Sequence, residues 1–188
     1  MGLLQKFFGK DRVPPDQTEE IFRRHLDRDF RAFPMAESTA TPLELQALGT
    51  RLCISFPCEF VSHVCGRFPG VYVEVKEEVW PRPKAYDVGP FWSFLYGLHT
   101  FTPCSSSEDW MRLDFVAERF QKNTGYKCAP VLQIIGDADV YCVDSSGALV
   151  RYDHESNALI PEADDFWVIF EREVEQLKNR KMQKITDA

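Results

Sequence analysis

The 188-residue sequence has no apolar run of the roughly 20 residues that a membrane-spanning helix requires. It also has no excess of basic residues: 22 Lys and Arg stand against 29 Asp and Glu, which gives a formal net charge of −7. Binding to phosphate groups depends on a basic surface. We therefore expect neither membrane insertion nor nucleic acid as the main ligand.

The six cysteines form no Cys-x-x-Cys pair, and the first residues contain no apolar stretch of the length that a secretion signal needs. Several cysteines lie inside apolar runs, where a free thiol behaves as a small buried hydrophobic group. Disulfides persist mainly in oxidising compartments. We therefore expect reduced thiols in a cytoplasmic protein.

Residues 131–152 contain three short apolar runs that are separated by the turn sequences Gly136-Asp137-Ala138-Asp139 and Asp144-Ser145-Ser146-Gly147. Parallel pairing needs a long crossover, so this segment can form only an antiparallel meander. Over residues 71–75, valines alternate with polar residues, as in a half-buried strand. The aromatic run 91–101 is also of strand type.

Capping and stop signals predict five helices around these strands. The expected helices run from Asp16 to about residue 33, from Thr41 to Gly49, from about Pro57 to Gly66, from Ser105 with Glu108 to about Asn123, and from Asp164 or Asp165 to Leu177. The first and second begin with a capping box, and Pro42 at the first helical position strengthens the second.

This order of elements predicts an α+β fold: a single domain whose antiparallel-rich sheet has helices packed mainly on one face. A chain of 188 residues with 44% hydrophobic residues can form one such core. Within it we expect an N-terminal helical extension over 1–40, the main domain over 41–178 and a frayed basic tail over 179–188.

Two groups of residues suggest metal sites, but neither pattern is strong. Asp137 and Asp139 could offer carboxylates to Mg²⁺ or Ca²⁺, with Asp144 nearby, yet Asp is also a favoured turn residue. Cys58, His63 and Cys65 are five and two residues apart, which does not place three ligands on one tetrahedron. We expect buried thiols beside a surface histidine there, and no metal or other cofactor.

Two further groups suggest catalysis. Ser105-Ser106-Ser107 beside Cys104 lacks the Gly-x-Ser-x-Gly elbow of a nucleophilic serine, and helix capping accounts for the serines. In Asp153-His154-Glu155 the carboxylates could tune a general base, but a solvated turn at a strand end is the commoner arrangement. We therefore expect a protein that is not an enzyme.

The order of several short motifs resembles that of the SMI1/KNR4 (SUKH) superfamily over about residues 41–178. The segments that carry the resemblance are the capped helix at 41–49, Phe56-Pro57-Cys58-Glu59-Phe60, Gly66, Ile134-Ile135-Gly136-Asp137, the strand 140–143, Gly147, Asp153-His154-Glu155 and the helix containing Phe166. Two positions depart from the family pattern: Phe56 replaces the usual Leu, and Cys65-Gly66-Arg67 stands where Asn-Gly-Gly is expected.

The resemblance implies a compact α+β domain without a cofactor, and in bacteria most often an immunity protein that binds and neutralises a cognate toxin. Fungal relatives act as cell-wall and signalling regulators. Residues 137–175 contain eleven acidic and two basic residues, a net charge of −9, which would complement a basic toxin surface. The alternatives are a regulatory or scaffolding module without a toxin partner and, less favoured, a metal-dependent enzyme that uses Asp137, Asp139 and Asp144.

We expect the partner to bind the sheet surface and its loops, where aromatic anchors and an acidic rim would meet. The residues predicted to bind it are Trp80, Asp87, Trp92, Asp137 and Asp139, with Asp153 and Glu155 at the edge. The competing interpretation places both tryptophans in the core and the carboxylates in solvated turns.

Overall fold

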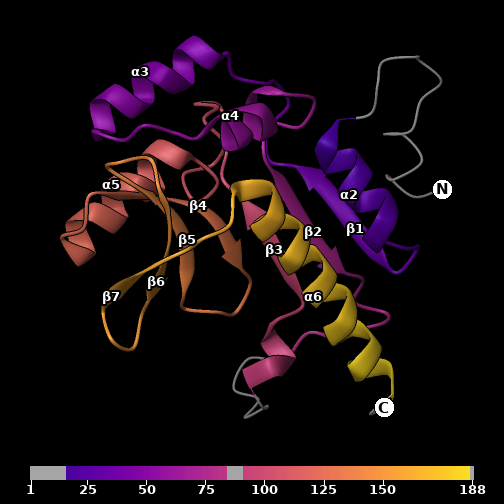
Figure 1. The fold of residues 1–188 in the computed structure, drawn as a ribbon. Coiled ribbons are helices and arrows are strands. Elements are labelled where there is room, and N and C mark those ends of the chain that lie inside the picture. The colour runs from indigo at the N-terminus through magenta and orange to yellow at the C-terminus, as the bar shows by residue number, and fades with distance from the viewer. Residues whose placement is uncertain (1–15, 84–90, 187–188) are drawn as a thin grey trace.

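The structure is a computed structural model that describes residues 16–83 and 91–186 (Figure 1). Asp87 lies outside the described residues, and so does the side chain of Trp92. In the described part, one seven-stranded sheet and five α-helices form a single α+β domain, as predicted.

The seven strands lie in the sheet in the same order as in the sequence, and every neighbouring pair is antiparallel. The strands are β1 (Phe30–Pro34), β2 (Val71–Val75), β3 (Gly97–Thr100), β4 (Cys128–Ile134), β5 (Val140–Asp144), β6 (Leu149–Asp153) and β7 (Ala158–Pro161). The predicted meander is therefore confirmed as β4, β5 and β6, and a short edge strand, β7, extends it.

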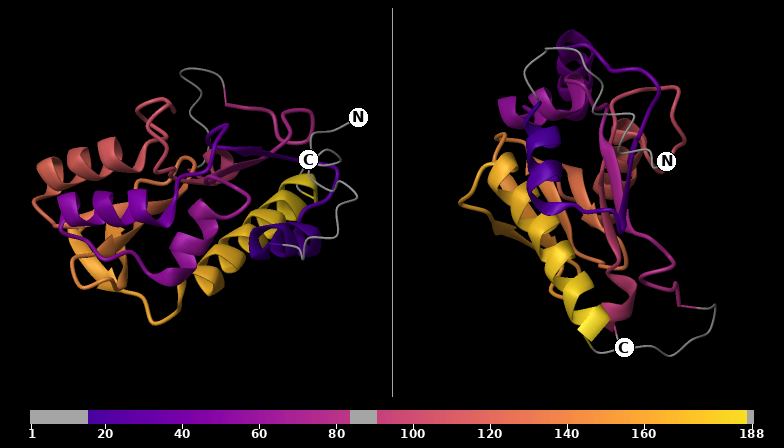
Figure 2. Two further views of the ribbon diagram at one scale, coloured as in Figure 1. Left: turned by 90° about the horizontal axis from the view of Figure 1, so that it is seen from above. Right: turned by 90° about the vertical axis from the view of Figure 1, so that its right-hand side faces the viewer.

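The helices cover the two faces of the sheet unequally (Figures 1 and 2). They are α2 (Gln17–His25), α3 (Pro42–Leu52), α4 (Cys58–Cys65), α5 (Leu113–Thr124) and α6 (Phe166–Thr186), with a 3₁₀ turn η1 (Phe91–Phe94). Helices α2, α4 and α6 pack together on one face, whereas α5 lies against the other.

Side-chain contacts of adjacent strand positions establish these two faces. Tyr141 of β5 donates its hydroxyl to Glu173 of α6 at 2.7 Å. Tyr152, which pairs with Val140 and so points the opposite way, packs its ring edge-on against Phe120 of α5 at 5.0 Å. Helices α6 and α5 therefore lie on opposite sides of the sheet.

Several predicted caps are confirmed. The Asp16 carboxylate accepts the backbone N–H groups of Thr18 and Glu19, and Thr41 and Glu44 form a reciprocal capping box. Gly125 ends α5 in the left-handed conformation with φ 79°, and the Asp165 carboxylate accepts the Val168 N–H at 3.0 Å. These caps satisfy backbone groups that a helix end leaves unpaired.

The first predicted helix is too long. It ends at His25, and Phe30–Pro34 forms β1, which pairs with β2. Apolar residues at helical spacing continue past the end of the helix, but Asp27 accepts the Asp29 N–H at 2.9 Å in a tight turn that redirects the chain. The segment predicted as a helical extension thus supplies both a helix and a strand.

Other boundaries also differ from prediction. Gly49 lies inside α3, where a Cβ would come within 2.5 Å of the Ile54 carbonyl oxygen, and the helix ends three residues later. Ser105 caps no helix: α5 begins at Leu113, and Ser107 donates to the Met35 carbonyl at 3.0 Å instead. Only Gly97–Thr100 of the aromatic run is a strand.

The predicted frayed tail is helical as far as Thr186. Lys181 explains this difference, because its side chain is buried and its ammonium group contacts Asp27 at 2.5 Å and Asp29 at 3.1 Å. These contacts join the last turns of α6 to the turn before β1. The apolar residues at helical spacing along this helix are buried: Phe166, Ile169, Phe170, Val174 and Leu177.

His63 lies at the centre of the helical side, fully buried, where a surface histidine was predicted. Its Nδ1 lies 2.9 Å from the Thr18 hydroxyl of α2 and its Nε2 lies 2.8 Å from the Thr100 hydroxyl of β3. Burial lowers the pKa of His63 to about 3, so the ring is neutral. The expected neighbouring thiols are not in the core, since Cys58 is exposed and Cys65 half-buried.

Because of this buried neutral ring, stability should fall at acidic pH. Unfolded histidine titrates near pH 6.5, so below that value the unfolded state binds a proton that folded His63 refuses until about pH 3. From pH 7 to pH 5 this one group should cost about 2 kcal/mol. Urea denaturation at both pH values measures the loss.

The matched variant is His63→Gln, which cannot titrate. It should be less stable than the wild type at pH 7, because one or both threonine contacts weaken, yet lose about 2 kcal/mol less between pH 7 and pH 5. An equal pH dependence in both proteins would contradict the assignment of this ring as a buried neutral group.

Candidate functional site

The face of the sheet opposite α6 carries an unbroken row of side chains, one from each strand. The successive strand pairings align Phe33, Tyr72, His99, Gln133, Val140, Tyr152 and Leu159. We call this the open face. Helix α5 packs against β4 and, through Phe120, against Tyr152 of β6, so the part formed by β2 and β3 is the less covered one (Figure 2).

Two adjoining hollows occupy the open face. The first, of about 460 Å³, is lined by Tyr72, His99 and Trp110 together with the turn after β4; we call it the aromatic hollow. The second, of about 430 Å³, lies between α5 and the sheet. Both are lined by Gln133 and Ala138, so the two hollows adjoin each other on the sheet.

Three rings define the aromatic hollow. Tyr72 and His99 are nearly parallel, with ring centroids 6.1 Å apart and 10° between their planes. Trp110 stands almost perpendicular to both, at 82° to Tyr72 and 88° to His99. Trp110 is 42% exposed, although its indole N–H is bound to Glu108 at 2.9 Å. The rings therefore present π surfaces in two directions.

His99 forms part of the floor of this hollow. Burial lowers the pKa of His99 to about 4, so its ring is neutral at physiological pH. Its Nδ1 is buried and has no hydrogen-bond partner in the part of the chain that the structure describes. A buried polar atom without a partner costs free energy and is rare in folded proteins.

The turn between β4 and β5 forms one wall of the aromatic hollow. Arg151 pairs with Asp139 at 2.9 Å and with Asp137 at 3.7 Å, so one cation faces two carboxylates. The Gln133 amide nitrogen lies against the carbonyl oxygens of Asp137 at 2.7 Å and Asp139 at 3.0 Å. These bonds hold the turn in place. Arg151 pairs in register with Tyr141, which contacts α6, so these ion pairs lie on the α6 side of the turn.

Among the residues predicted to bind the partner, Trp80 was assigned wrongly. It is 1% exposed and donates its indole N–H to the Ser93 carbonyl at 3.0 Å, so it belongs to the main hydrophobic core. Prolines next to Trp80 suggested an exposed loop, but they exclude only a central strand and say nothing about burial of the neighbouring side chain.

The predicted acidic residues lie in two neighbouring turns. Asp137 borders the aromatic hollow, and Asp139 accepts the His154 N–H at 2.9 Å, which joins the β4–β5 turn to the β6–β7 turn. Asp153 accepts the Ser156 N–H at 2.7 Å, a bond that lowers the pKa of Asp153, and Glu155 is exposed. In the described ranges no three His, Cys, Asp or Glu side chains are grouped to hold a metal ion.

Four residues of the open face were not among the predicted site residues: Tyr72, His99, Trp110 and Gln133. Trp110 falls within the helix predicted from Ser105, but it lies in the turn before α5. The alternation around Tyr72 predicted its strand correctly. What brings these residues together is the register of β2, β3 and β4, and the sequence gives no local signal for that register.

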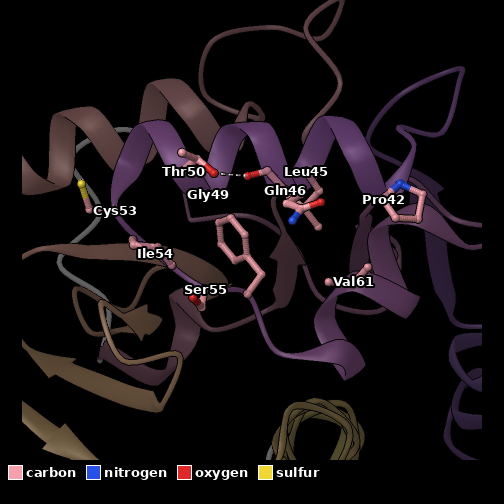
Figure 3. A pocket seen from close by; sticks show the side chains of 10 residues that line it. Pro42, Leu45, Gln46, Gly49, Thr50, Cys53, Ile54, Ser55 and Val61 are labelled. Carbon is pink, nitrogen blue, oxygen red and sulfur yellow. Dashed lines mark hydrogen bonds between the residues drawn. The ribbon is translucent and has the colours of Figure 1, made fainter.

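A third hollow, of about 450 Å³, lies between α3 and the extended segment that follows it (Figure 3). Leu45, Gln46 and Thr50 line it from the helix, and Phe56 from the other side. Thr50 donates its hydroxyl to the Gln46 carbonyl at 3.0 Å. Its one ionisable lining residue is Cys53, so this hollow offers less for specific recognition than the open face.

No model of a known protein family matches the sequence, and no curated protein matches it significantly. The SMI1/KNR4 resemblance therefore depends on the motifs alone. Within residues 16–83 and 91–186, no helix combines the length and apolar character that crossing a membrane requires.

The two tryptophans should respond differently to truncation. Trp80→Ala removes a buried indole and its hydrogen bond, and should lower the free energy of unfolding by about 3–5 kcal/mol. Trp110→Ala removes a half-exposed ring and should cost about 1 kcal/mol or less. Urea denaturation at pH 7 compares them. Equal losses for the two variants would show that Trp110 is a structural residue rather than a free anchor.

Proposed function

We propose that the protein acts by binding another protein through the open face of its sheet. The observation that carries this proposal is the cluster of Tyr72, His99 and half-exposed Trp110 on the face that α2, α4 and α6 leave uncovered. Large aromatic side chains in a partly desolvated hollow are typical anchors of protein interfaces, and Trp and Tyr are enriched among them.

The open face also fits the size that binding requires. A standard interface buries about 800 Å² on each partner, and the two adjoining hollows span the sheet from Tyr72 on β2 to Tyr152 on β6. The strands beneath them are continuously paired, so a partner would meet a surface that needs little ordering.

Charge favours a basic partner. The formal net charge is −7 for the whole chain and −9 for residues 137–175. Beside the aromatic hollow, Glu108 accepts the indole N–H of Trp110, whereas Asp137 and Asp139 are directed at Arg151 on the α6 side of the turn. Carboxylates at the rim of an interface steer a basic partner and affect mainly the association rate.

The specific form that we favour is an immunity protein that neutralises a cognate bacterial toxin. The segments that resemble SMI1/KNR4 proteins support this form: α3 has its capping box, α4 follows Phe56–Phe60 and ends at Gly66, and α6 begins at Phe166. The alternative is a regulatory or scaffolding module, which would use the same face.

Co-expression with the products of neighbouring genes tests this proposal. One of them should arrest bacterial growth when expressed alone, and this protein should bind it and restore growth. Trp110→Ala should weaken the complex about 10-fold or more, because interface tryptophans commonly contribute 2 kcal/mol or more. Calorimetry measures the affinity.

The matched control is Phe115→Ala, which removes a ring of similar exposure, 39%, that does not line the aromatic hollow. It should change the affinity less than 2-fold. A bound neighbour that does not impair growth would favour the regulatory alternative. If no neighbouring product binds, the immunity function is wrong.

A further inference from the structure

We infer that the hollow between α5 and the sheet, which we call the α5 hollow, binds a small molecule that carries one carboxylate group on an apolar body. This inference goes beyond the proposed function and does not depend on it. It follows from three properties of the α5 hollow: its apolar walls, the charge of its lining residues and the hydrogen-bonding groups that remain free in it.

The walls of the α5 hollow are largely apolar. Val116 and Phe120 line it from α5, and Pro130 and Val140 line it from β4 and β5. Tyr152 of β6 lines it as well, with its ring edge-on to Phe120 at 5.0 Å. The volume of about 430 Å³ lies in the range of small-molecule sites, which are mostly apolar with a few polar groups that orient the ligand.

The charge of the α5 hollow is opposite in sign to that of the whole chain. Among the described residues that line it, Arg119 carries a permanent charge and none is acidic. Residues 119–127 contain three basic residues and no acidic one, although the net charge of the chain is −7. The α5 hollow is therefore a positively charged site on an acidic protein, and an anion complements it.

The guanidinium group of Arg119 is available to a ligand. Arg119 is exposed and makes no hydrogen bond or ion pair with any described residue. Arg112 and Arg51, by contrast, both bind Asp114, at 2.8 Å and 3.2 Å. A guanidinium group without a partner keeps five N–H donors in a planar arrangement that matches the two oxygens of a carboxylate.

Two further side chains of the α5 hollow can assist Arg119. Asn123 and His154 are exposed, and their side chains make no hydrogen bond within the described residues. Each has at least one N–H group. Other polar groups are already engaged, since Thr124 donates to a carbonyl of its own helix at 2.8 Å and the Tyr152 hydroxyl donates to the Asn157 side chain at 3.0 Å.

A single guanidinium group favours a carboxylate over a phosphate. A carboxylate carries one negative charge and accepts two parallel N–H bonds from a guanidinium group. A phosphate monoester carries a charge of about −1.5 to −2 at pH 7. It would keep uncompensated charge beside apolar walls, because Arg119 is the one permanent cation among the described lining residues.

A titration with small carboxylates tests the inference. The probe is benzoate, added at constant ionic strength to ¹⁵N-labelled protein while the amide signals of Asn123 and Val140 and the Nε–H signal of Arg119 are followed by NMR. These signals should shift and saturate with a dissociation constant of about 5 mM, as for other small fragments. Benzamide, which has the same shape without the charge, should bind about 5-fold more weakly. Acetate, which has no apolar body, should not saturate in the same range.

Variants of α5 establish the role of Arg119. Arg119→Gln should weaken benzoate binding about 5-fold and leave benzamide binding unchanged. Arg119→Lys, which keeps the charge but not the planar fork, should be intermediate. The matched control is Lys122→Gln, which removes the same charge from an exposed position of the same helix that does not line the α5 hollow. It should change the affinity for benzoate less than about 2-fold, because salt screens distant surface charges.

The remaining outcomes would overturn the inference. Equal binding of benzoate and benzamide, or equal losses in Arg119→Gln and Lys122→Gln, would remove the role of the Arg119 guanidinium group. Tighter binding of phenyl phosphate than of benzoate would make the α5 hollow a phosphate site. If benzoate gives no saturable shifts at Asn123 and Val140 up to about 50 mM, the α5 hollow is not a carboxylate site.

Discussion

The packing of α6 against one face of the sheet is the interaction on which most of the structure depends. Phe166 lies edge-on to Phe60 of α4 at 5.3 Å, and Phe170 lies 6.0 Å from Phe22 of α2, so the three helices share one aromatic core. His63 sits among these rings and bonds to Thr18 and Thr100. Side chains along a strand alternate between the two faces of the sheet. The strand side chains that do not face α2, α4 and α6 therefore form the open face, which remains available for binding.

Buried polar contacts determine how α6 lies along the sheet. Glu173 accepts the Tyr141 hydroxyl in the middle of the helix, and Lys181 contacts Asp27 and Asp29 near its end. Shifting the helix by one turn would leave the buried side chains of Glu173 and Lys181 without these partners, which is far costlier than losing an exposed ion pair. The helix position in turn determines which sheet face stays open.

Local signals predicted much of the fold. The Gly and Asp turns of the meander, the Thr41 capping box and the Asp165 cap of α6 each involve residues close together in the sequence. Strand β1 could not be predicted in this way, because Phe22, Leu26 and Phe30 fit a helical period and only pairing with β2 makes Phe30 part of a strand. The aromatic residues of the candidate site could not be predicted from the sequence for the same reason. The acidic turn at Asp137 was found, whereas the alignment of Tyr72 with His99 depends on strand register.

The central claim is that the open face, and not the helical face, meets the partner. Hydroxyl-radical footprinting of the protein alone and in its complex tests this claim directly. The account predicts that Tyr72 and Trp110 become protected while Met182, exposed on α6, stays equally reactive. Protection of Met182 with unchanged reactivity of Trp110 would contradict it.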